Sequence, residues 1–431
     1  MGLSSWGNYP KHNSKVIDAS KLTSSKLDFE TPDAIPFGNG RSYGDSALAD
    51  FQIHCRSRDF FINFDEQKGL LHCQSGVLLS EVIDAFLPRG FFLKVSPGTK
   101  LITIGGAIAS DVHGKNHHKE GCFSECVESF SLMLPSGNVV LCSREENKTL
   151  FEATCGGMGL TGIILDVKFT LKKVSSQFIN QITIKTRNLR ETFDAFETYQ
   201  DKTYSVAWID CLAKGDDIGK CLLMVGEFAD DKNFKYKRKK KKNIPFNFPS
   251  FVLNQYSVKA FNYLYYTKAP NGISKQKVDI DTFFYPLDAI QNWNRIYGKN
   301  GFTQYQFILP KESSYEGLLE ILNAIATSGK GSFLAVLKLY GKENSNLLSF
   351  PIEGYSLALD FKMEPGLLEL LDQLDQIVLK YHGRIYLAKD VRVSKEVFEK
   401  GYDKIEQFRS LRKEYDMKET LNSLQSKRVN I

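Results

Sequence analysis

The sequence lacks several features that would assign it to a simple class. Its eight cysteines are irregularly spaced and include no C-x-x-C pair, so a disulfide framework is not expected. No stretch approaches the roughly 20 apolar residues of a membrane-spanning helix, and the first residues, Met1 to Trp6, lack the apolar core of a secretory signal. We therefore expect reduced thiols and a cytoplasmic protein.

The length and composition are typical of a folded globular protein. The 431 residues are 42% hydrophobic and 25% charged, which excludes disorder and fits about two or three domains. The net charge of +6 is local, because eight Lys and Arg fall within residues 232–242 and the remaining residues sum to −2. This distribution argues against a broadly basic, nucleic-acid-binding protein.

The two halves of the chain differ in pattern. From about residue 31 to 172, Gly-rich turns alternate with short strands and helices, and the spacing of Leu79, Val82, Ile83 and Phe86 predicts a helix that ends at Pro88. After Lys173, longer elements predict a second α+β domain. The expected strands are 205–211, 221–228, 302–309, 332–340 and 356–361, and the expected helices are 189–199, 316–327 and 366–380.

Three Gly-rich segments, 38–45, 97–107 and 156–162, could hold a phosphate through backbone N–H groups. The third contains G-x-G-x-x-G, the fingerprint of a Rossmann dinucleotide site. That fingerprint needs a strand before it and a helix after it, whereas here a helical pattern at 149–153 precedes and a strand pattern at 163–169 follows. A Rossmann fold is therefore disfavoured.

A histidine-rich segment, 113–118, lies just before Cys122 and Cys126. Three interpretations remain open: a zinc site, a turn whose histidines are held by backbone hydrogen bonds, or a polar loop over a bound cofactor. The crowded spacing disfavours zinc, because structural zinc sites pair distant ligands. We assign no metal site.

Taken together, residues 36–45, 96–99, 105–118 and 156–162 resemble the vanillyl-alcohol-oxidase (PCMH-type) FAD-binding family. Within it they are most similar to the flavin subunits of decaprenylphosphoryl-β-D-ribose 2′-epimerases. The likeness continues through 283–288, 304–307, 338–341 and 386–390, and so covers nearly the whole chain. It implies an α+β, two-domain fold with a PCMH-type FAD-binding domain (5–174), a substrate domain on a mainly antiparallel sheet (175–383) and a C-terminal segment (384–431) that returns to the FAD domain.

The resemblance implies FAD as cofactor. It is expected to be non-covalent, because Arg41 stands where covalent relatives carry a histidine. The cofactor-binding residues that it implies are Gly38, Asn39, Gly40, Arg41, Ser42, Tyr43, Pro97, Gly98, Thr99, Gly105, Gly106, Ala107, Ala109, Ser110, Asp111, His113, Gly114, Asn116, His117, Gly159, Gly162, Ile163 and Tyr386.

The implied reaction oxidises the 2′-hydroxyl of a polyprenyl-phosphoryl-β-D-ribofuranose to the 2′-keto sugar, with hydride passing to flavin N5. This is the first half of an epimerisation that a separate short-chain dehydrogenase/reductase partner would complete. Lys389 is the first catalytic candidate, with His113 and Tyr43 beside the flavin. Without the motif, Lys389 would be taken for a surface lysine paired with Asp390. The alternative reaction is that of an alditol or aldonolactone oxidase acting on a soluble sugar.

The substrate-binding candidates are Lys115, Trp208, Gln304, Gln306, Lys338, Ser356 and Lys389. Gln304 and Gln306 alternate along an expected strand and should face one side, as a sugar site or as a solvated face. Lys338 could meet the substrate phosphate or protect an edge strand, and Trp208 could stack on the ligand or belong to the core. Mycobacterial-type members carry a cysteine where this sequence has Ala358, so covalent capture there is not expected.

The basic run is followed by an aromatic-rich stretch, and together they span residues 235–266. Clustered cations beside aromatic residues suit the surface of an anionic membrane, which places the protein at the inner membrane surface. A mobile, solvated loop fits the composition equally well. Nucleic-acid binding is not expected, because no binding module accompanies the run.

Overall fold

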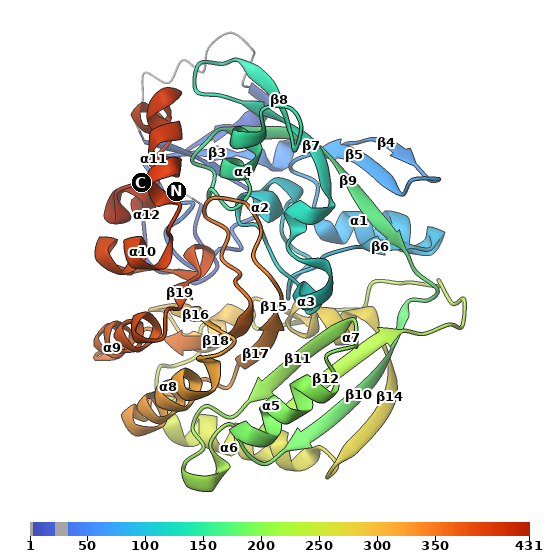
Figure 1. Cartoon of the computed structure of the whole chain (residues 1–431), viewed down its shortest axis with the longest axis vertical. Helices are drawn as coiled ribbons and strands as arrows, with labels where there is room; N and C mark the ends of the chain where they lie inside the picture. The colour runs from blue at the N-terminus through green and yellow to red at the C-terminus, as the bar shows by residue number, and fades with distance from the viewer. Residues whose placement is uncertain (1–2, 22–32) are drawn as a thin grey trace.

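The computed structural model describes residues 3–21 and 33–431. The expected FAD domain, 5–174, includes some residues that lie outside this range. Met1 and Gly2, at the start of the sequence, also lie outside it. Two bodies of secondary structure lie one above the other in Figure 1, the first built from the N-terminal third and the second from the middle of the chain. Of the described helices, none is long and apolar enough to cross a membrane.

The first body contains two sheets. A small parallel sheet has the order β1-β3-β2, with β1 at Lys15–Asp18, β2 at Ala34–Phe37 and β3 at Phe51–His54. A second, antiparallel sheet has the order β4-β5-β9-β7-β8, with β6 also paired to β9. Its strands are β4 (Phe61–Asp65), β5 (Leu70–Gln74), β6 (Phe91–Leu93), β7 (Val127–Met133), β8 (Val139–Ser143) and β9 (Ile163–Lys173).

Short helices cover this sheet. Helix α1 (Leu79–Phe86) buries the four apolar residues whose spacing predicted it, and its first turn is capped by Glu81, whose carboxylate accepts from Leu78 N at 2.8 Å. The predicted end at Pro88 is confirmed, because a short turn at Leu87–Arg89 follows the helix. The other helices of this body are α2 (Ile104–Ala109), α3 (His117–Glu120) and α4 (Lys148–Thr154).

The G-x-G-x-x-G segment lies between α4 and β9, so a helix precedes it and a strand follows it, as the sequence indicated. The segment packs on α2 through backbone hydrogen bonds from Gly156 N to Ile108 O (3.0 Å) and from Met158 N to Ala109 O (2.8 Å). The Rossmann arrangement is therefore absent at this segment.

The second body is one antiparallel sheet of eight strands in the order β14-β10-β12-β11-β17-β18-β16-β19. The strands are β10 (Phe178–Thr186), β11 (Tyr204–Ile209), β12 (Cys221–Phe228), β14 (Ile273–Asp279), β16 (Phe302–Pro310), β17 (Ala335–Tyr340), β18 (Gly354–Lys362) and β19 (Arg384–Ile385). The α+β class and the antiparallel second sheet are thus confirmed. Strands β10 and β14 were not predicted.

Strand alternation separates the two faces of this sheet. Odd-numbered residues of β16 and β18 point to the covering helices: Tyr305 donates to Asp375 of α9, and Tyr355 stacks on Phe193 of α5 at 4.3 Å between ring centroids. Even-numbered residues point the other way, toward the first body. The helices on this side of the chain are α5 (Leu189–Thr198), α8 (Ser314–Ser328) and α9 (Leu367–Lys380), each within two residues of its predicted bounds.

The remaining elements of the middle region are the paired short strands β13 (Lys242–Asn243) and β15 (Ile290–Gln291), with α6 (Gln255–Lys268) and α7 (Ile280–Phe284). The sequence did not predict α6. Its apolar residues are spread around the helix, so no single amphipathic face marks it.

The C-terminal helices α10 (Lys395–Gly401), α11 (Ile405–Glu414) and α12 (Leu424–Val429) lie beside the N-terminal strands in Figure 1. Leu424 N donates to Leu48 O at 2.7 Å, and Arg428 reaches both Asp45 and Asp390 at 2.8 Å. Burial raises the pKa of Asp45 to about 6, although Arg428 acts in the opposite direction. Arg428 is therefore the cation that makes two buried carboxylates tolerable.

We expect Arg428→Met to lower the free energy of unfolding by about 3–5 kcal/mol, because it leaves the buried carboxylates of Asp45 and Asp390 without their cation. The matched control is Lys427→Met, which removes an exposed pair with Asp33 and should cost at most about 1 kcal/mol. Urea unfolding followed by fluorescence measures both. Equal losses for the two variants would contradict the role given to Arg428.

Candidate active site

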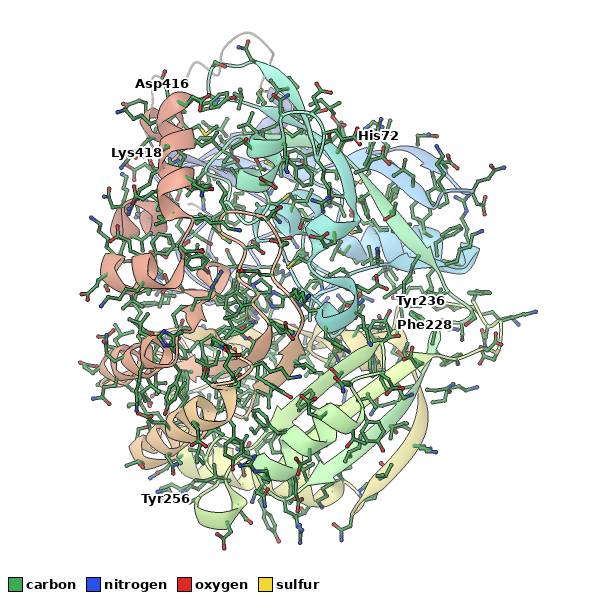
Figure 2. All side chains as sticks on the ribbon, in the orientation of Figure 1. His72, Phe228, Tyr236, Tyr256, Asp416 and Lys418 are labelled. Atoms are coloured by element: carbon green, nitrogen blue, oxygen red, sulfur yellow. The ribbon has the colours of Figure 1, made fainter. Side chains whose placement is uncertain are left out.

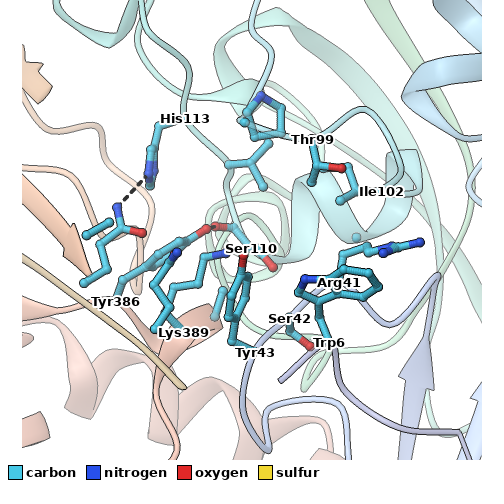
Figure 3. A pocket seen from close by; sticks show the side chains of 18 of the residues that line it. Trp6, Arg41, Ser42, Tyr43, Thr99, Ile102, Ser110, His113, Tyr386 and Lys389 are labelled. Carbon is cyan, nitrogen blue, oxygen red and sulfur yellow. Dashed lines mark hydrogen bonds between the residues drawn. The ribbon is translucent and has the colours of Figure 1, made fainter. Parts of the chain in front are cut away.

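A cavity of about 600 Å³ lies between the two bodies, within the size range of ligand sites. One wall comes from the Gly-rich loops and α2, and the other from the even-numbered face of the large sheet. Figure 3 shows side chains from both walls, with Tyr43, His113, Tyr386 and Lys389 turned toward a common space.

The first Gly-rich loop and the segment 386–390 form one continuous part of the wall. Tyr43 N donates to Ala388 O at 3.1 Å, and a Cβ on Gly44 would lie 1.6 Å from Asp390 O. Only glycine permits this approach of two backbones. Close contact of these distant segments places Tyr43 beneath Lys389, whose Nζ lies 3.7 Å from the centre of the Tyr43 ring.

The second Gly-rich segment borders the cavity without filling it. A Cβ added to Gly98 would meet nothing within 4 Å, so the space beside it is open. Thr99 Oγ1 donates to Asp288 at 2.8 Å and Lys100 N donates to the same carboxylate at 2.9 Å, which ties this segment to the second body. Glycine N–H groups are thus held at the edge of a space open to a ligand.

His113 and Gln306 meet across the two walls. Gln306 Nε2 lies 3.2 Å from His113 Nε2, and burial lowers the histidine pKa well below its usual value, so the ring is neutral. We assign the proton to Nδ1, because the Gln306 amide donates to Nε2. Nδ1 is buried and has no partner among the described residues, which leaves a donor for a ligand.

Three lysines, Lys115, Lys338 and Lys389, line the same cavity. Burial lowers their pKa values, to about 7 for Lys115 and Lys389 and to about 8 for Lys338, and the charge of Lys338 lowers the other two further. A cavity with this many lysines favours an anionic ligand.

Asp360 is the carboxylate that faces Lys389. Burial raises its pKa to about 7, and its Oδ1 accepts from Gln304 Nε2 at 2.5 Å. In turn, the Asp360 charge raises the pKa of Lys389 and opposes the effect of burial. The sequence analysis missed Asp360, although it lies two residues from Ala358 on the same face of β18.

The structure brings together most of the expected residues. Those that line the cavity are Gly38, Asn39, Gly40, Arg41, Ser42, Tyr43, Pro97, Gly98, Thr99, Gly105, Gly106, Ala109, Ser110, His113, Lys115, Gly159, Gly162, Trp208, Gln304, Gln306, Lys338, Tyr386 and Lys389. Those that it places away from the cavity wall are Ala107, Asp111, Gly114, Asn116, His117, Ile163 and Ser356.

The residues behind the wall have structural partners. Asp111 is fully buried and accepts from Ser124 N, Asn344, Asn346 and Ser349 at 2.7–3.1 Å. Its side chain is therefore occupied by other loops. Ser356 lies 3.3 Å from Gln306 Nε2 and supports that amide from behind.

The histidine-rich segment is divided between two roles. His117 Nδ1 accepts from Gly341 N at 3.1 Å, and His118 Nε2 lies 2.8 Å from Lys202 O, so backbone groups hold both rings. Only His113 of the three faces the cavity. Within residues 3–21 and 33–431, no group of three His, Cys, Asp or Glu is arranged to hold a metal ion.

The positions of Lys389, Lys338 and Trp208 bear on the alternatives that the sequence left open for each of them. Lys389 faces the cavity while Asp390 pairs with Arg428, so the two neighbours are not an exposed ion pair. Lys338 lies on β17, an interior strand between β11 and β18, and does not protect an edge. Trp208 combines two roles, because its ring borders the cavity and its Nε1 donates to Phe333 O at 3.1 Å.

Comparisons with known proteins agree with this geometry. The sequence profile of the FAD binding domain family matches residues 9–143. The chain is 36% identical over 394 residues to decaprenylphosphoryl-β-D-ribose oxidase of Mycolicibacterium smegmatis, covering 88% of this chain and 85% of that protein. The chain belongs to the decaprenylphosphoryl-β-D-ribose oxidase family. It is an FAD-dependent oxidoreductase with a PCMH-type FAD-binding domain.

Other relatives are more distant. An uncharacterised protein in the mprA 5′ region of Streptomyces coelicolor is 25% identical over 373 residues, covering 82% of this chain and all of that protein. The L-gulonolactone oxidase of Mus musculus is 29% identical over 167 residues, 38% of this chain and 37% of that enzyme. The oxidase family membership thus rests on a match that spans both bodies of the fold.

The cavity fits FAD. Glycines border the open space, as a pyrophosphate requires, and the buried Arg41 Nε and His113 Nδ1 have no partners among the described residues. Arg41 lies over the Trp6 ring at 4.1 Å, and its loop, 38–45, contains no histidine. Among the described residues that line the cavity, His113 is the one histidine.

We expect Gly98→Val to weaken FAD binding by at least about tenfold, because a side chain there enters space that the cofactor needs. The apoprotein should unfold at the same temperature as the wild type, since nothing lies within 4 Å of the added Cβ. Titration of apoprotein with FAD, followed by flavin fluorescence, measures the first effect. Unchanged affinity would show that the cofactor lies elsewhere.

Proposed function

We propose that this enzyme oxidises the 2′-hydroxyl of a polyprenyl-phosphoryl-β-D-ribofuranose to the 2′-keto sugar lipid. The proposal depends on one observation above all: three lysines line the cavity beside a polar face suited to a sugar. The match to the mycobacterial oxidase, whose name gives its substrate as decaprenylphosphoryl-β-D-ribose, supports it. Bound FAD would supply the hydride acceptor, flavin N5.

Lys389 is the group that takes the hydroxyl proton. Its pKa of about 7 leaves a substantial fraction of neutral amine at neutral pH, so Nζ can accept a proton from the sugar. The Tyr43 ring beneath Nζ stabilises the ammonium that results. Neutral His113 and Tyr386, whose hydroxyl donates to Ser110 O at 2.8 Å, keep the neighbouring wall rigid.

Substrate recognition divides between amides and cations. Gln304 and Gln306 project from one face of β16 and present amide groups to the sugar hydroxyls, with Ser356 orienting Gln306. Lys338 and Lys115 would pair with the phosphate, a diester whose single negative charge offsets part of the cost of burying the two ammonium groups. Trp208 would pack against the sugar or the first prenyl units.

The remaining parts of the proposal concern the setting of the reaction. FAD is held without a covalent bond, in agreement with Arg41 in the first Gly-rich loop. A separate short-chain dehydrogenase/reductase would reduce the keto sugar and complete the epimerisation to the arabinose form. The enzyme works in the cytoplasm, in peripheral contact with the inner membrane through residues 235–266, where a polyprenyl-linked substrate resides.

A second candidate function is oxidation of a soluble alditol or aldonolactone. The partial match to L-gulonolactone oxidase favours it, but that match covers 38% of this chain. Three cavity lysines have no clear use with an uncharged sugar. We therefore place this reaction second.

Under anaerobic conditions, polyprenyl-phosphoryl ribose should bleach the flavin absorbance of the wild-type enzyme. Lys389→Ala should slow the bleaching by at least about a hundredfold, the scale of general-base catalysis, with FAD still bound. Lys342→Ala, which removes an exposed lysine outside the cavity, is the control and should bleach normally. Bleaching by free alditols instead of the lipid would favour the second candidate.

Activity should rise as the pH increases through about 7, because the neutral form of Lys389 accepts the proton. Asp360→Asn removes the anion that raises the pKa of Lys389, so this rise should shift to lower pH. The side-chain amide introduced by Asp360→Asn keeps an oxygen that can accept from Gln304. Lys338→Gln should shift the rise in activity to higher pH, because the charge of Lys338 lowers the pKa of Lys389. A pH–rate profile that does not move in either variant would refute Lys389 as the base.

A further inference from the structure

The charge of the chain is segregated more strongly than the basic run alone indicates. Residues 232–278 are 47 consecutive positions with 12 Lys and Arg and no Asp or Glu. The rest of the chain carries 44 Lys and Arg against 50 Asp and Glu. We call residues 232–278 the acid-free segment.

The same segment holds most of the exposed large apolar side chains. Nine of the fifteen such side chains in the described chain lie within it: Phe246, Phe251, Val252, Tyr256, Phe261, Tyr263, Leu264, Tyr265 and Ile273. Single exposed apolar residues are common on proteins, whereas a gathering of this kind marks an interaction surface. Figure 2 shows Tyr256 at the lower margin of the molecule, at the far end from Asp416 and Lys418.

Helix α6 shows how the exposed face arises. It is anchored by two buried residues, Val258 and Asn262, and Asn262 Nδ2 donates to Asp210 at 2.7 Å. Tyr256 lies about two turns before the consecutive residues Tyr263 and Leu264, and the three are 72%, 64% and 65% exposed. The preceding loop adds Phe251, which is 75% exposed. These four side chains have no cover within the described chain.

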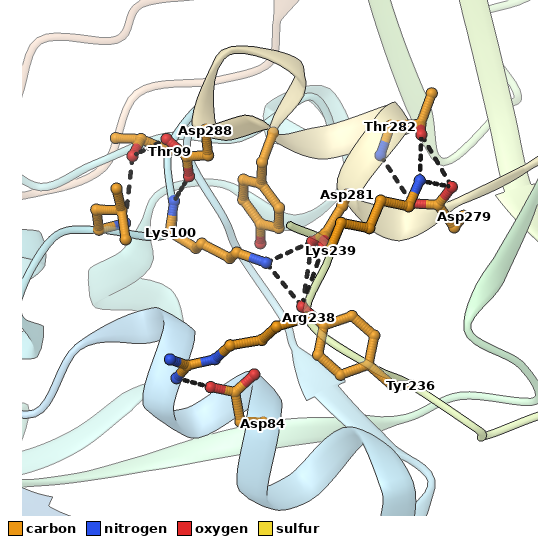
Figure 4. A network of polar contacts seen from close by, with 12 residues as sticks. Asp84, Thr99, Lys100, Tyr236, Arg238, Lys239, Asp279, Asp281, Thr282 and Asp288 are labelled. Atoms are coloured by element: carbon orange, nitrogen blue, oxygen red, sulfur yellow. Dashed lines mark hydrogen bonds and ion pairs between the residues drawn. The ribbon is translucent and has the colours of Figure 1, made fainter. Parts of the chain in front are cut away.

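Part of the basic run is fixed in place at a distance from this face, because Figure 2 shows Tyr236 and Tyr256 on opposite sides of the view. Arg238 pairs with Asp84 and Lys239 with Asp279, while Tyr236 joins a buried network in which Lys100 Nζ contacts Tyr236 OH at 2.7 Å and Asp281 at 2.5 Å (Figure 4). These contacts hold the run across the junction of the two bodies, in contrast to the solvated loop that the sequence left open.

Other cations of the run remain available to a partner. Lys235, Lys237, Lys240 and Lys242 are exposed, and no carboxylate of residues 3–21 or 33–431 lies within ion-pair distance of them. A second copy of this chain is a poor occupant, because two surfaces that each carry several unpaired lysines would repel. Cations beside tyrosine, phenylalanine and leucine suit the interface of an anionic bilayer.

The apolar face continues into the cavity. Phe261 stacks on Tyr265 at 5.7 Å, and Tyr265 packs on Trp208 at 4.9 Å between ring centroids. Phe261 and Tyr265 are exposed, while Trp208 and Tyr265 also line the cavity. A line of aromatic rings therefore connects the outer face of α6 with the cavity.

We propose that the acid-free segment binds an anionic lipid bilayer, with Phe251, Tyr263 and Leu264 inserted into its interface, and that the prenyl chain of the substrate enters the cavity past Tyr265. Lys259 and Lys268 are exposed on α6, four residues from Tyr263 and Leu264 respectively, and contact lipid phosphates at the same surface. The route of the prenyl chain rests on the proposed reaction, and the binding of the bilayer deepens the proposed membrane contact of residues 235–266.

The test is cosedimentation of the FAD-loaded enzyme with phosphatidylcholine vesicles that contain or lack phosphatidylglycerol. We expect binding to the anionic vesicles only, with loss of binding at high salt. The triple variant Phe251→Ser/Tyr263→Ser/Leu264→Ser should bind at least about tenfold more weakly, because it removes the inserted apolar area. The matched control is Phe60→Ser/Ile62→Ser, whose residues are 68% and 51% exposed on the other body and should not affect binding.

Wild-type enzyme that stays in the supernatant with anionic vesicles, or a triple variant that binds as the wild type does, would overturn the proposal. A dimer in sedimentation equilibrium that the triple variant abolishes would also overturn the proposal, because a second copy of the chain would then occupy this surface. Turnover of detergent-dispersed substrate separates this proposal from the proposed function. The triple variant should bleach normally there, and failure of the wild type to bleach would count against the function alone.

Discussion

The structure depends on the burial of cations at the junction of its two bodies. Lys115, Lys338 and Lys389 share one cavity, and burial lowers the pKa of each. Among the described residues, the charge of Asp360 opposes this effect at Lys389. A site of this kind is costly for the empty protein, and its cost is offset when an anion enters. The same burial that favours an anion also brings Lys389 to a pKa of about 7, so the proposed phosphate binding and the proposed proton transfer have one physical origin.

The junction is built by two simple devices. Alternation along β16 and β18 sends odd-numbered side chains to the helices and even-numbered ones to the cavity, so one sheet serves as both core and site. The C-terminal helices then return to the first body, where Arg428 joins Asp45 to Asp390. Because Asp390 follows Lys389 directly, this anchor fixes the backbone that presents the proposed catalytic lysine.

Much of this arrangement could be predicted from the sequence. Helix α1 follows from apolar spacing, and Gln304 and Gln306 share a face because strands alternate. Other features depend on contacts between distant segments and leave no local signal. Asp111 belongs to the loop of the family motif, yet its carboxylate is taken by Asn344, Asn346 and Ser349, far along the chain. Likewise, the charge of Asp360 acts on Lys389 only because β18 and the segment that follows β19 both lie beside β16. Helix α6 is stable without an amphipathic pattern because Val258 and Asn262 anchor it.

The central claim is that this enzyme removes hydride from C2 of the ribose in a polyprenyl-phosphoryl substrate. The most direct measurement is rapid anaerobic mixing of the FAD-loaded enzyme with substrate that carries deuterium at C2 or, for comparison, at C3 of the ribose. The account predicts slower flavin bleaching with the C2 label and an unchanged rate with the C3 label. Slowing by the C3 label alone, or equal rates for all three substrates, would contradict it.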